Sequence, residues 1–357
     1  MKSLNEIIKT AVSAGSSDIH ITTNRPASCR VHGILYTLDE EDLTNDDLKE
    51  MFKPFMRIKG VSKHLEDLGE ADFAYQHFDE EGNGYRFRTN VFKQKGELAC
   101  VMRLLPTEMP NPEDLGLPEA VQNFVYLKRG IILVTGETGS GKSTTLASLI
   151  NVINKTQQKH IITVEDPIEF VHKHQMSIVN QRELGIDTLS FSNALRAALR
   201  EDPDIVLVGE MRDLETIQTA LTAAETGHLV FSTLHTNSAP ATIDRVIDVF
   251  PPEQQQQVRV QLANVLEGIV CQQLLPIREG RGRVAAFEVM VSNTAIRNLI
   301  REGKTFQLAS NIETGRKQGM QSMDDCIFKL YENKKIFAED AVRFALDQGK
   351  MSQRCML

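Results

Sequence analysis

The spacing of apolar residues divides the first part of the chain into helices and short strands. Apolar positions from 4 to 12 recur at helical spacing, which predicts a first helix, and between 18 and 38 they alternate, which predicts strands. Two helical stretches, at about 46–56 and 61–68, precede three strand-like runs between 71 and 104 that include a turn, DEEGNG. This order of elements predicts an α+β domain with an antiparallel sheet.

A cluster of prolines follows these strands. Four of the twelve prolines fall within thirteen residues, and their missing N–H groups discourage regular structure. These prolines are Pro106, Pro110, Pro112 and Pro118. We therefore predict an N-terminal domain over 1–104, a linker over 105–118 and a second domain over 119–357.

The second half has a different pattern. Four short continuous apolar runs, GIILVTG, HIITVED, PDIVLVGE and HLVFSTLH, alternate with helical stretches, which is typical of a parallel sheet covered on both faces. From about 292 onward the pattern is helical, and the four glutamines at 254–257 fit a solvated helix start. The second domain is therefore predicted to be a doubly wound α/β domain with a helical C-terminal part.

A phosphate-binding loop lies between the first of these runs and the next helix. Residues 136–143 read GETGSGKS, which satisfies the pattern G-x-x-x-x-G-K-[ST] in the strand-to-helix context that the motif requires. Backbone N–H groups of such a loop surround a phosphate, Lys142 reaches the outer phosphates, and Ser143 offers its hydroxyl to Mg²⁺. The absence of a guanine-specific Asn-Lys-x-Asp sequence favours ATP over GTP. The predicted nucleotide-binding residues are Gly136, Glu137, Thr138, Gly139, Ser140, Gly141, Lys142, Ser143 and Thr144.

Acidic residues follow two other predicted strands. Glu210 comes after the strand at 204–208, where such folds hold an acidic residue near the metal and the attacking water. Gly209 stands where phosphate-loop proteins usually carry an aspartate, so we place Mg²⁺ at Ser143 with Glu210 near it and water completing its shell. Glu165 and Glu169 lie at the end of the strand at 162–165, and ordinary solvated acids are the alternative interpretation.

Histidine and arginine supply further candidates. His235 ends the run HLVFSTLH on the side that faces the phosphates, whereas His228 at its start is more easily structural. Phosphoryl transfer needs positive charge on the γ-phosphate, which ring ATPases often take from a neighbouring subunit. The arginine candidates are Arg196 and Arg200, four apart on one predicted helix face, Arg212, and, acting across an interface, Arg86, Arg88 and Arg103. A salt-bridged surface is the alternative for each of them.

Composition limits the classes of function. The 357 residues are 41% hydrophobic and 25% charged, as in ordinary soluble proteins of about two domains. A net charge of −8 argues against a general nucleic-acid binder, and no apolar run approaches the ~20 residues that span a bilayer. The five cysteines are scattered, so we expect reduced thiols in a cytoplasmic protein.

Four blocks of sequence carry a family resemblance. GETGSGKST, ITVEDPIEF, LREDPDIVLVGEMRD and GHLVFSTLHTNSA resemble, in order and spacing, the secretion and type IV pilus ATPase family, and AIRNLIRE at 295–302 is similar to a segment of its pilus retraction ATPases. The resemblance implies a homohexameric ring of chains, each with a PAS-like N-terminal and a RecA-like C-terminal domain. It also implies that Glu210 is the catalytic glutamate, that Glu165 and Glu169 are acids of the Asp box, and that His235 is a sensor.

The function implied is an ATP-driven motor that retracts type IV pili for twitching motility. It would work on the cytoplasmic side of the inner membrane, against a platform protein, with no transmembrane segment of its own. Extension and secretion motors usually carry an extra N-terminal domain and a four-cysteine zinc insertion; we expect this protein to have neither, which favours retraction. The alternatives are an accessory retraction motor, an extension or secretion ATPase, a nucleotide-gated switch and a nucleic-acid translocase, the last disfavoured by charge.

Overall fold

The structure, a computed structural model, describes residues 3–79, 81–106, 108–280 and 282–356. Glu80 of the predicted turn, Thr107 of the predicted linker and the first two residues of the predicted N-terminal domain lie outside this set. The chain forms two compact units. Unit 1 contains Met1–Glu108 together with Asp166–Val171 and Glu183–Leu189, and unit 2 contains the rest. Two segments that follow strands of the second half thus belong to unit 1.

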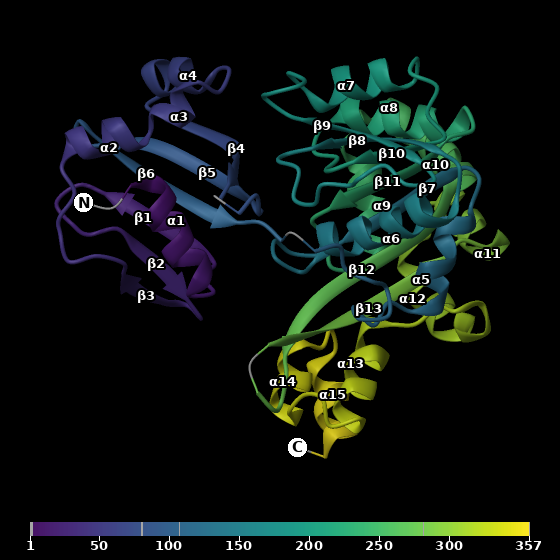
Figure 1. The fold of residues 1–357 in the computed structure, drawn as a ribbon. Helices are drawn as coiled ribbons and strands as arrows, with labels where there is room; N and C mark the ends of the chain where they lie inside the picture. Colours follow the sequence, from purple (N-terminus) through teal and green to yellow (C-terminus); the bar gives the residue numbers. More distant parts are fainter. Residues whose placement is uncertain (1–2, 80, 107, 281, 357) are drawn as a thin grey trace. The chain divides into compact units, whose positions relative to one another are not determined.

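Unit 1 is an antiparallel sheet of six strands in the order β3-β2-β1-β6-β5-β4 (Figure 1). Its strands are β1 (Asp18–Thr22), β2 (Ser28–Val31), β3 (Ile34–Thr37), β4 (Glu70–Phe78), β5 (Gly84–Gln94) and β6 (Glu97–Leu104). Its helices are α1 (Leu4–Ser13), α2 (Asn45–Met51), α3 (Lys53–Met56) and α4 (Val61–Asp67). Helices and strands share one apolar core, so the α+β prediction is confirmed.

Local sequence explains where several of these elements begin and turn. Ser3 and Glu6 form a capping box that starts α1, with the Ser3 N–H donating to the Glu6 carboxylate at 2.7 Å. His32 and Gly33 both have positive φ, 50° and 85°, which is the conformation that a two-residue hairpin between β2 and β3 requires.

Unit 2 is built on a sheet of seven strands in the order β13-β12-β7-β11-β10-β8-β9 (Figure 1). Its strands are β7 (Gly130–Thr135), β8 (His160–Glu165), β9 (Ile178–Glu183), β10 (Ile205–Val208), β11 (Leu229–Leu234), β12 (Leu266–Pro276) and β13 (Arg283–Val291). β7, β8, β10 and β11 are parallel, as predicted, and β12 is parallel to β7, whereas β13 is antiparallel to β12. β9, β12 and β13 were not predicted from the sequence.

The parallel strands are mostly apolar because helices cover both faces of the sheet. Ile131 and Leu133 of β7 enter the core on one face, and Ile132 and Val134 enter the core on the other. The first core is shared with α7 (Phe191–Ala198), α8 (Leu214–Glu225), α9 (Ala239–Asp248) and α10 (Pro252–Val265). The second is shared with α5 (Glu119–Gln122), η1 (Asn123–Tyr126) and α6 (Lys142–Thr156).

Arg196 and Arg200 do not share a helix in the structure, so the expectation that they lie on one helix face is wrong. α7 ends at Ala198, and Arg200 lies in the turn beyond it. The chain then takes a left-handed conformation at Asp202, with φ of 54°, immediately before Pro203. A residue before proline is disfavoured in the α-helical region, so the helix has to end ahead of this pair.

The C-terminal part is helical, as predicted. It comprises α11 (Thr294–Arg301), η2 (Thr305–Gln307), α12 (Leu308–Thr314), η3 (Gly315–Gln318), α13 (Met323–Glu332), α14 (Ala338–Phe344) and α15 (Gln348–Cys355). In α11, Ile296 and Ile300 are buried, and Gly303 just beyond its end has φ of 68°. AIRNLIRE therefore forms an amphipathic helix that is followed by a glycine in the left-handed conformation.

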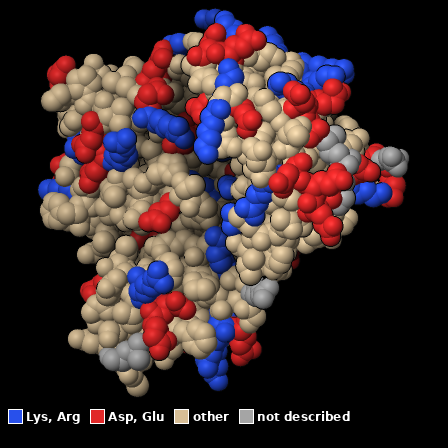
Figure 2. Space-filling view, turned by 90° about the vertical axis from the view of Figure 1, so that its left-hand side faces the viewer, with Lys and Arg blue, Asp and Glu red and all other residues tan. Residues whose placement is uncertain are grey.

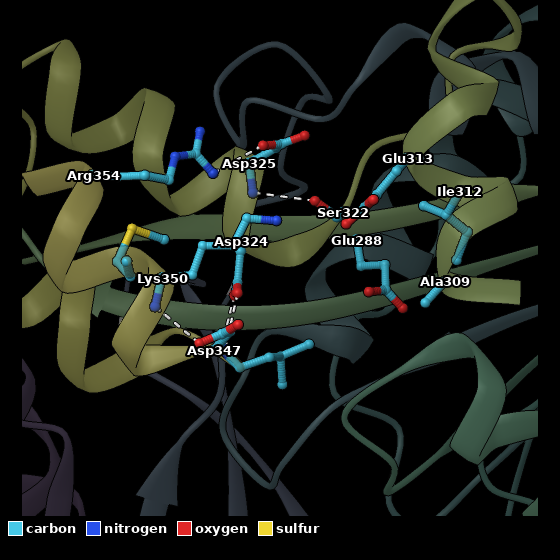
Figure 3. Close-up of a pocket in the computed structure, with 12 residues that line it drawn as sticks. Glu288, Ala309, Ile312, Glu313, Ser322, Asp324, Asp325, Asp347, Lys350 and Arg354 are labelled. Carbon is cyan, nitrogen blue, oxygen red and sulfur yellow. Dashed lines mark hydrogen bonds and ion pairs between the residues drawn. The ribbon is translucent and has the colours of Figure 1, made fainter. Parts of the chain in front are cut away.

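Figure 3 shows a pocket among these helices, whose volume is about 200 Å³, and two of its acids, Asp324 and Asp325, hold neighbouring elements together. The Asp324 carboxylate accepts hydrogen bonds from the backbone N–H groups of Leu346, at 2.7 Å, and Asp347, at 2.9 Å. Arg354 forms an ion pair with Asp325 at 3.0 Å. Within the described residues, no group of three or more His, Cys, Asp or Glu side chains is arranged to hold a metal ion.

The face drawn in Figure 2 carries charges of both signs, and most of the cysteines are buried. On the face drawn in Figure 2, basic and acidic side chains are interspersed rather than gathered into a field of one sign. All five cysteines are free thiols, and four of them are buried. Among the described residues, none of the helices has the length and apolar character needed to cross a membrane.

Candidate active site

The phosphate-binding loop lies at the carboxyl end of β7, where its glycines give the backbone its shape. Gly136, Gly139 and Gly141 all have positive φ, of 142°, 80° and 91°. α6 begins at Lys142 directly after Gly141, and none of the side chains that the structure describes caps its first turn. The N–H groups of that turn and the positive end of the helix dipole are therefore available to an anion.

Side chains of the loop add to this anion site. The Lys142 ammonium donates to the carbonyl oxygens of Gly136, at 2.7 Å, and Glu137, at 2.9 Å, so it lies across the loop. Ser140 is buried, yet its hydroxyl has no hydrogen-bond partner among the described residues. A buried hydroxyl without a partner costs free energy unless a ligand satisfies it. The loop therefore fits a phosphate group, and the exposed Ser143 beside Lys142 fits a magnesium ligand.

Strand β12 packs tightly against the phosphate-binding loop. A Cβ atom added at Gly136 would lie 2.3 Å from the main-chain oxygen of Gln272, and one at Gly141 would lie 2.7 Å from the Gln272 Nε2 atom. Real Cβ atoms do not approach other atoms so closely, so glycine is needed at both positions. Gln272 was not identified from the sequence, although it follows the apolar run GIVC that could have indicated a buried strand.

Glu210, Arg212 and His235 form a charged cluster at the same edge of the sheet. Arg212 Nε lies 2.7 Å from Glu210 Oε1, and His235 Nε2 lies 3.2 Å from the same oxygen. Burial by itself would raise the pKa of the Glu210 carboxyl, but Arg212 and His235 outweigh it, so this pKa lies below its ordinary value. Glu210 is therefore ionised at neutral pH, and the sequence-predicted pair Glu210 and His235 is brought into contact.

Glu165 lies at the end of β8, and its orientation is set by its neighbours. The Thr163 hydroxyl donates to Glu165 Oε1 at 2.6 Å, and the Gln181 amide donates to the same oxygen at 3.0 Å. Gly209 sits against this strand, because a Cβ added there would lie 3.1 Å from the Val164 oxygen and 3.3 Å from Glu165 Cα. This close packing accounts for a glycine where an aspartate was expected.

Arg86, one of the candidates for action across an interface, is held inside unit 1. Its guanidinium forms an ion pair with Glu183 at 2.6 Å and donates to the Ile168 carbonyl at 3.2 Å. The Glu183 side chain is only 4% exposed. Arg86 thereby fastens both later segments of unit 1 to β5.

Arg88 and Glu169 also belong to unit 1. Arg88 forms an ion pair with Asp72 at 2.7 Å, and both side chains are nearly half exposed. Asp72 raises the pKa of Arg88, and the charges of Asp166 and Glu169 add to this effect. Arg88 and Glu169 are thus close enough to interact. Arg103, at the end of β6, pairs with Asp18 at 2.9 Å.

The other arginine candidates are on the surface of unit 2. Arg196 forms an ion pair with Glu215 and donates to the Asn193 side chain at 2.8 Å. Arg200 is exposed in the turn after α7. The geometry of Arg196 matches the salt-bridged surface that was its alternative interpretation, and the structure does not bring it to Glu210.

A pocket of about 450 Å³ adjoins the outer side of the phosphate-binding loop. Arg283, one of its residues, donates to the Gly139 carbonyl at 3.4 Å. The residues that line the pocket are Gly136, Glu137, Thr138, Gly139, Ser140, Asn237, Gln272, Gln273, Leu274, Arg283, Arg343, Phe344, Ala345 and Leu346. The lining residues outside the loop were not predicted from the sequence, because they come from strands and helices that only the fold brings together.

Comparisons with known proteins identify close relatives. The family model described as "Type II/IV secretion system protein" matches residues 1–339. The type IV pilus retraction ATPase PilT of Pseudomonas aeruginosa is 46% identical over 338 residues, 95% of this chain and 96% of its own length. The type IV pilus ATPase PilU of the same organism is 38% identical over 345 residues, 95% of this chain and 88% of its own. A crystal structure of the pilus retraction motor PilT with bound ADP matches with a TM-score of 0.91 at 50% identity, over 99% of this chain and 100% of that one.

Proposed function

Because the chain belongs to the type II/IV secretion system protein family, we propose that it is an ATPase that powers type IV pilus retraction. The observation that carries this function is the match to the retraction ATPase PilT over 95% of this chain and 96% of the relative. The fold agrees, over 99% of this chain, with that of a pilus retraction motor whose crystal structure contains bound ADP. The predicted fold class and function are thereby confirmed.

The phosphate-binding loop would hold the nucleotide. Its backbone N–H groups and Lys142 would neutralise the phosphates, and the Ser140 hydroxyl would gain the partner that it lacks among the described residues. Ser143 would hold Mg²⁺, which supplies charge that stabilises the transferring phosphoryl group. Glu210 could approach the same ion, although Gly209 offers no second carboxylate.

Glu210 would act on the attacking water. Its pKa is held below the ordinary value, so it is ionised and can accept a hydrogen bond from water, but it is a weak base. Its main contribution would therefore be to orient the water rather than to remove a proton early. His235, in contact with Glu210, would report the state of the reaction to the loop that leads into α9.

We extend the proposal to a homohexameric ring in which an arginine of one chain reaches the nucleotide of the next. Arg88 suits this role better than Arg86, because its partner Asp72 is nearly half exposed, and exposed ion pairs contribute only about 0–1 kcal/mol. Arg88 can therefore exchange partners at little cost. Glu165 and Glu169 would then be polar groups near the bound nucleotide, and Arg196 and Arg200 remain weaker candidates.

The partner of the motor would be a platform protein of the inner membrane, reached from the cytoplasmic side. An accessory retraction motor is the second candidate, since PilU is 38% identical over 95% of the chain. The charges interspersed on the face in Figure 2 give no support to a nucleic-acid translocase.

Gene deletion in the host organism tests the function. Loss of a retraction motor leaves cells piliated but unable to twitch, whereas loss of an extension motor leaves them without pili. Wild-type protein should restore twitching, and the Lys142→Ala variant, expressed at the same level, should not. Cells that lose their pili on deletion, or twitching restored by Lys142→Ala, would contradict the proposal.

A further inference from the structure

Gln272 lies against the phosphate-binding loop because of the register between the parallel strands β7 and β12. Cys271 of β12 pairs with Thr135, the last residue of β7. The next residue of β12 therefore extends beyond the end of β7, beside the first glycine of the loop. Gln272 is only 4% exposed, so its amide must find partners inside the protein.

The side chain of Gln272 meets the helix that follows the loop. The Thr145 hydroxyl, in the first turn of α6, donates to Gln272 Oε1 at 2.8 Å, and the Thr145 residue is fully buried. Buried hydrogen bonds of this kind fix the distance between the elements that they join. The bond therefore ties the start of α6 to β12.

Gln272 also packs against both ends of the loop. Its main-chain oxygen occupies the space beside Gly136, and its Nε2 atom occupies the space beside Gly141, as the close approach of an added Cβ shows. One residue thus contacts the beginning of the loop, its end and the first turn of α6. The curvature of the loop depends on the separation of these three points.

We propose that Gln272 is a positioning residue that sets the shape of the phosphate-binding loop for the β- and γ-phosphates of the nucleotide. The proposal rests on the proposed nucleotide-binding function of that loop. An amide suits the position because Oε1 must accept from Thr145 while an uncharged group faces Gly141. A carboxylate there would place negative charge beside the phosphates, and an alkyl chain would leave the Thr145 hydroxyl without an acceptor.

The test compares substitutions that keep or remove this hydrogen bond. Gln272→Met keeps the length of the side chain but cannot accept from Thr145, and Thr145→Val removes the donor, whereas Thr145→Ser keeps it. The matched control is Gln255→Met in α10, which removes a glutamine hydrogen bond to the Phe250 carbonyl, at 3.1 Å, away from the loop. Full-length variants are measured for the dissociation constant of Mg-ADP, the KM and kcat for Mg-ATP, and the melting temperature.

We expect Gln272→Met and Thr145→Val each to raise the ADP dissociation constant about tenfold, since one lost positioning bond is worth about that much. KM should rise by a similar factor and more than kcat falls. Thr145→Ser and Gln255→Met should stay within about threefold of wild type. Because Gln272→Met and Thr145→Val remove the same hydrogen bond, the double variant should bind ADP only slightly more weakly than either single variant.

A lower melting temperature with unchanged ADP affinity in Gln272→Met and Thr145→Val would overturn the proposal, because it would show a merely structural role. Should Gln272→Met fail to fold, the comparison of Thr145→Val with Thr145→Ser tests the same bond. A wild-type protein that does not bind ADP would instead refute the proposed function. Weakened binding in Thr145→Val, restored in Thr145→Ser, would support the positioning role.

Discussion

Replacing Gly136 with alanine tests how tightly the phosphate-binding loop is built. The new Cβ would lie 2.3 Å from the Gln272 oxygen and 2.7 Å from the Ser140 hydroxyl, at a backbone φ of 142°. Relief of the first contact needs a movement of roughly 1 Å, and the left-handed backbone adds about 1–2 kcal/mol of strain. We therefore expect a loss of about 2–4 kcal/mol in the free energy of unfolding and at least a tenfold weaker affinity for Mg-ADP.

Gly139→Ala is the matched control, because its φ is 80° but nothing lies within 4 Å of the added Cβ. It should cost about 1 kcal/mol of stability, from backbone strain alone. Urea unfolding of both variants measures the difference, and equilibrium binding of Mg-ADP measures the effect on the loop. Equal stability losses in the two variants would refute the reasoning, since the contact with Gln272 would then carry no cost.

Two further predictions concern ionisable groups. Glu210→Gln should keep Mg-ATP bound while kcat falls about 10²–10⁴-fold in single-turnover and steady-state assays, because the amide orients water poorly; turnover near the wild-type rate would remove Glu210 from its role. Burial lowers the pKa of His172 to about 4. Since the unfolded chain binds this proton from about pH 6.5 downward and the folded chain does not, stability should fall between pH 7 and pH 5, by about 2 kcal/mol at pH 5. His172→Gln should abolish this part of the pH dependence in urea unfolding, and an unchanged profile would contradict the assignment.

The parts of the fold that the sequence predicts well are those set by local pattern. β7, β10 and β11 are fully buried between helices and β8 is buried except at its two ends, so each contains a continuous apolar run that stands out without any structure. The phosphate-binding loop is equally local, because its glycines, Lys142 and Ser143 are neighbours in the chain. β9 mixes buried and exposed positions and has no such run, which explains why it was missed.

The parts that could not be predicted depend on contacts between distant residues. The ion pair between Arg86 and Glu183 joins positions 97 residues apart, and the hydrogen bond from Thr145 to Gln272 joins positions 127 residues apart. Neither pairing has a sequence spacing that reveals it, because only the folding of distant segments against each other brings the residues together. Arg200 was placed on the helix of Arg196 from their spacing alone, but α7 ends at Ala198, ahead of the Asp202–Pro203 pair through which a helix could not continue.

Release of phosphate from Mg-ATP tests the central claim most directly. The claim is that the loop at the end of β7 binds the nucleotide that drives the motor. Assembled wild-type protein should release phosphate over many turnovers, and Lys142→Ala, with an unchanged melting temperature, should release none above background. No phosphate release by the wild-type protein, or equal release by the Lys142→Ala variant, would contradict the account.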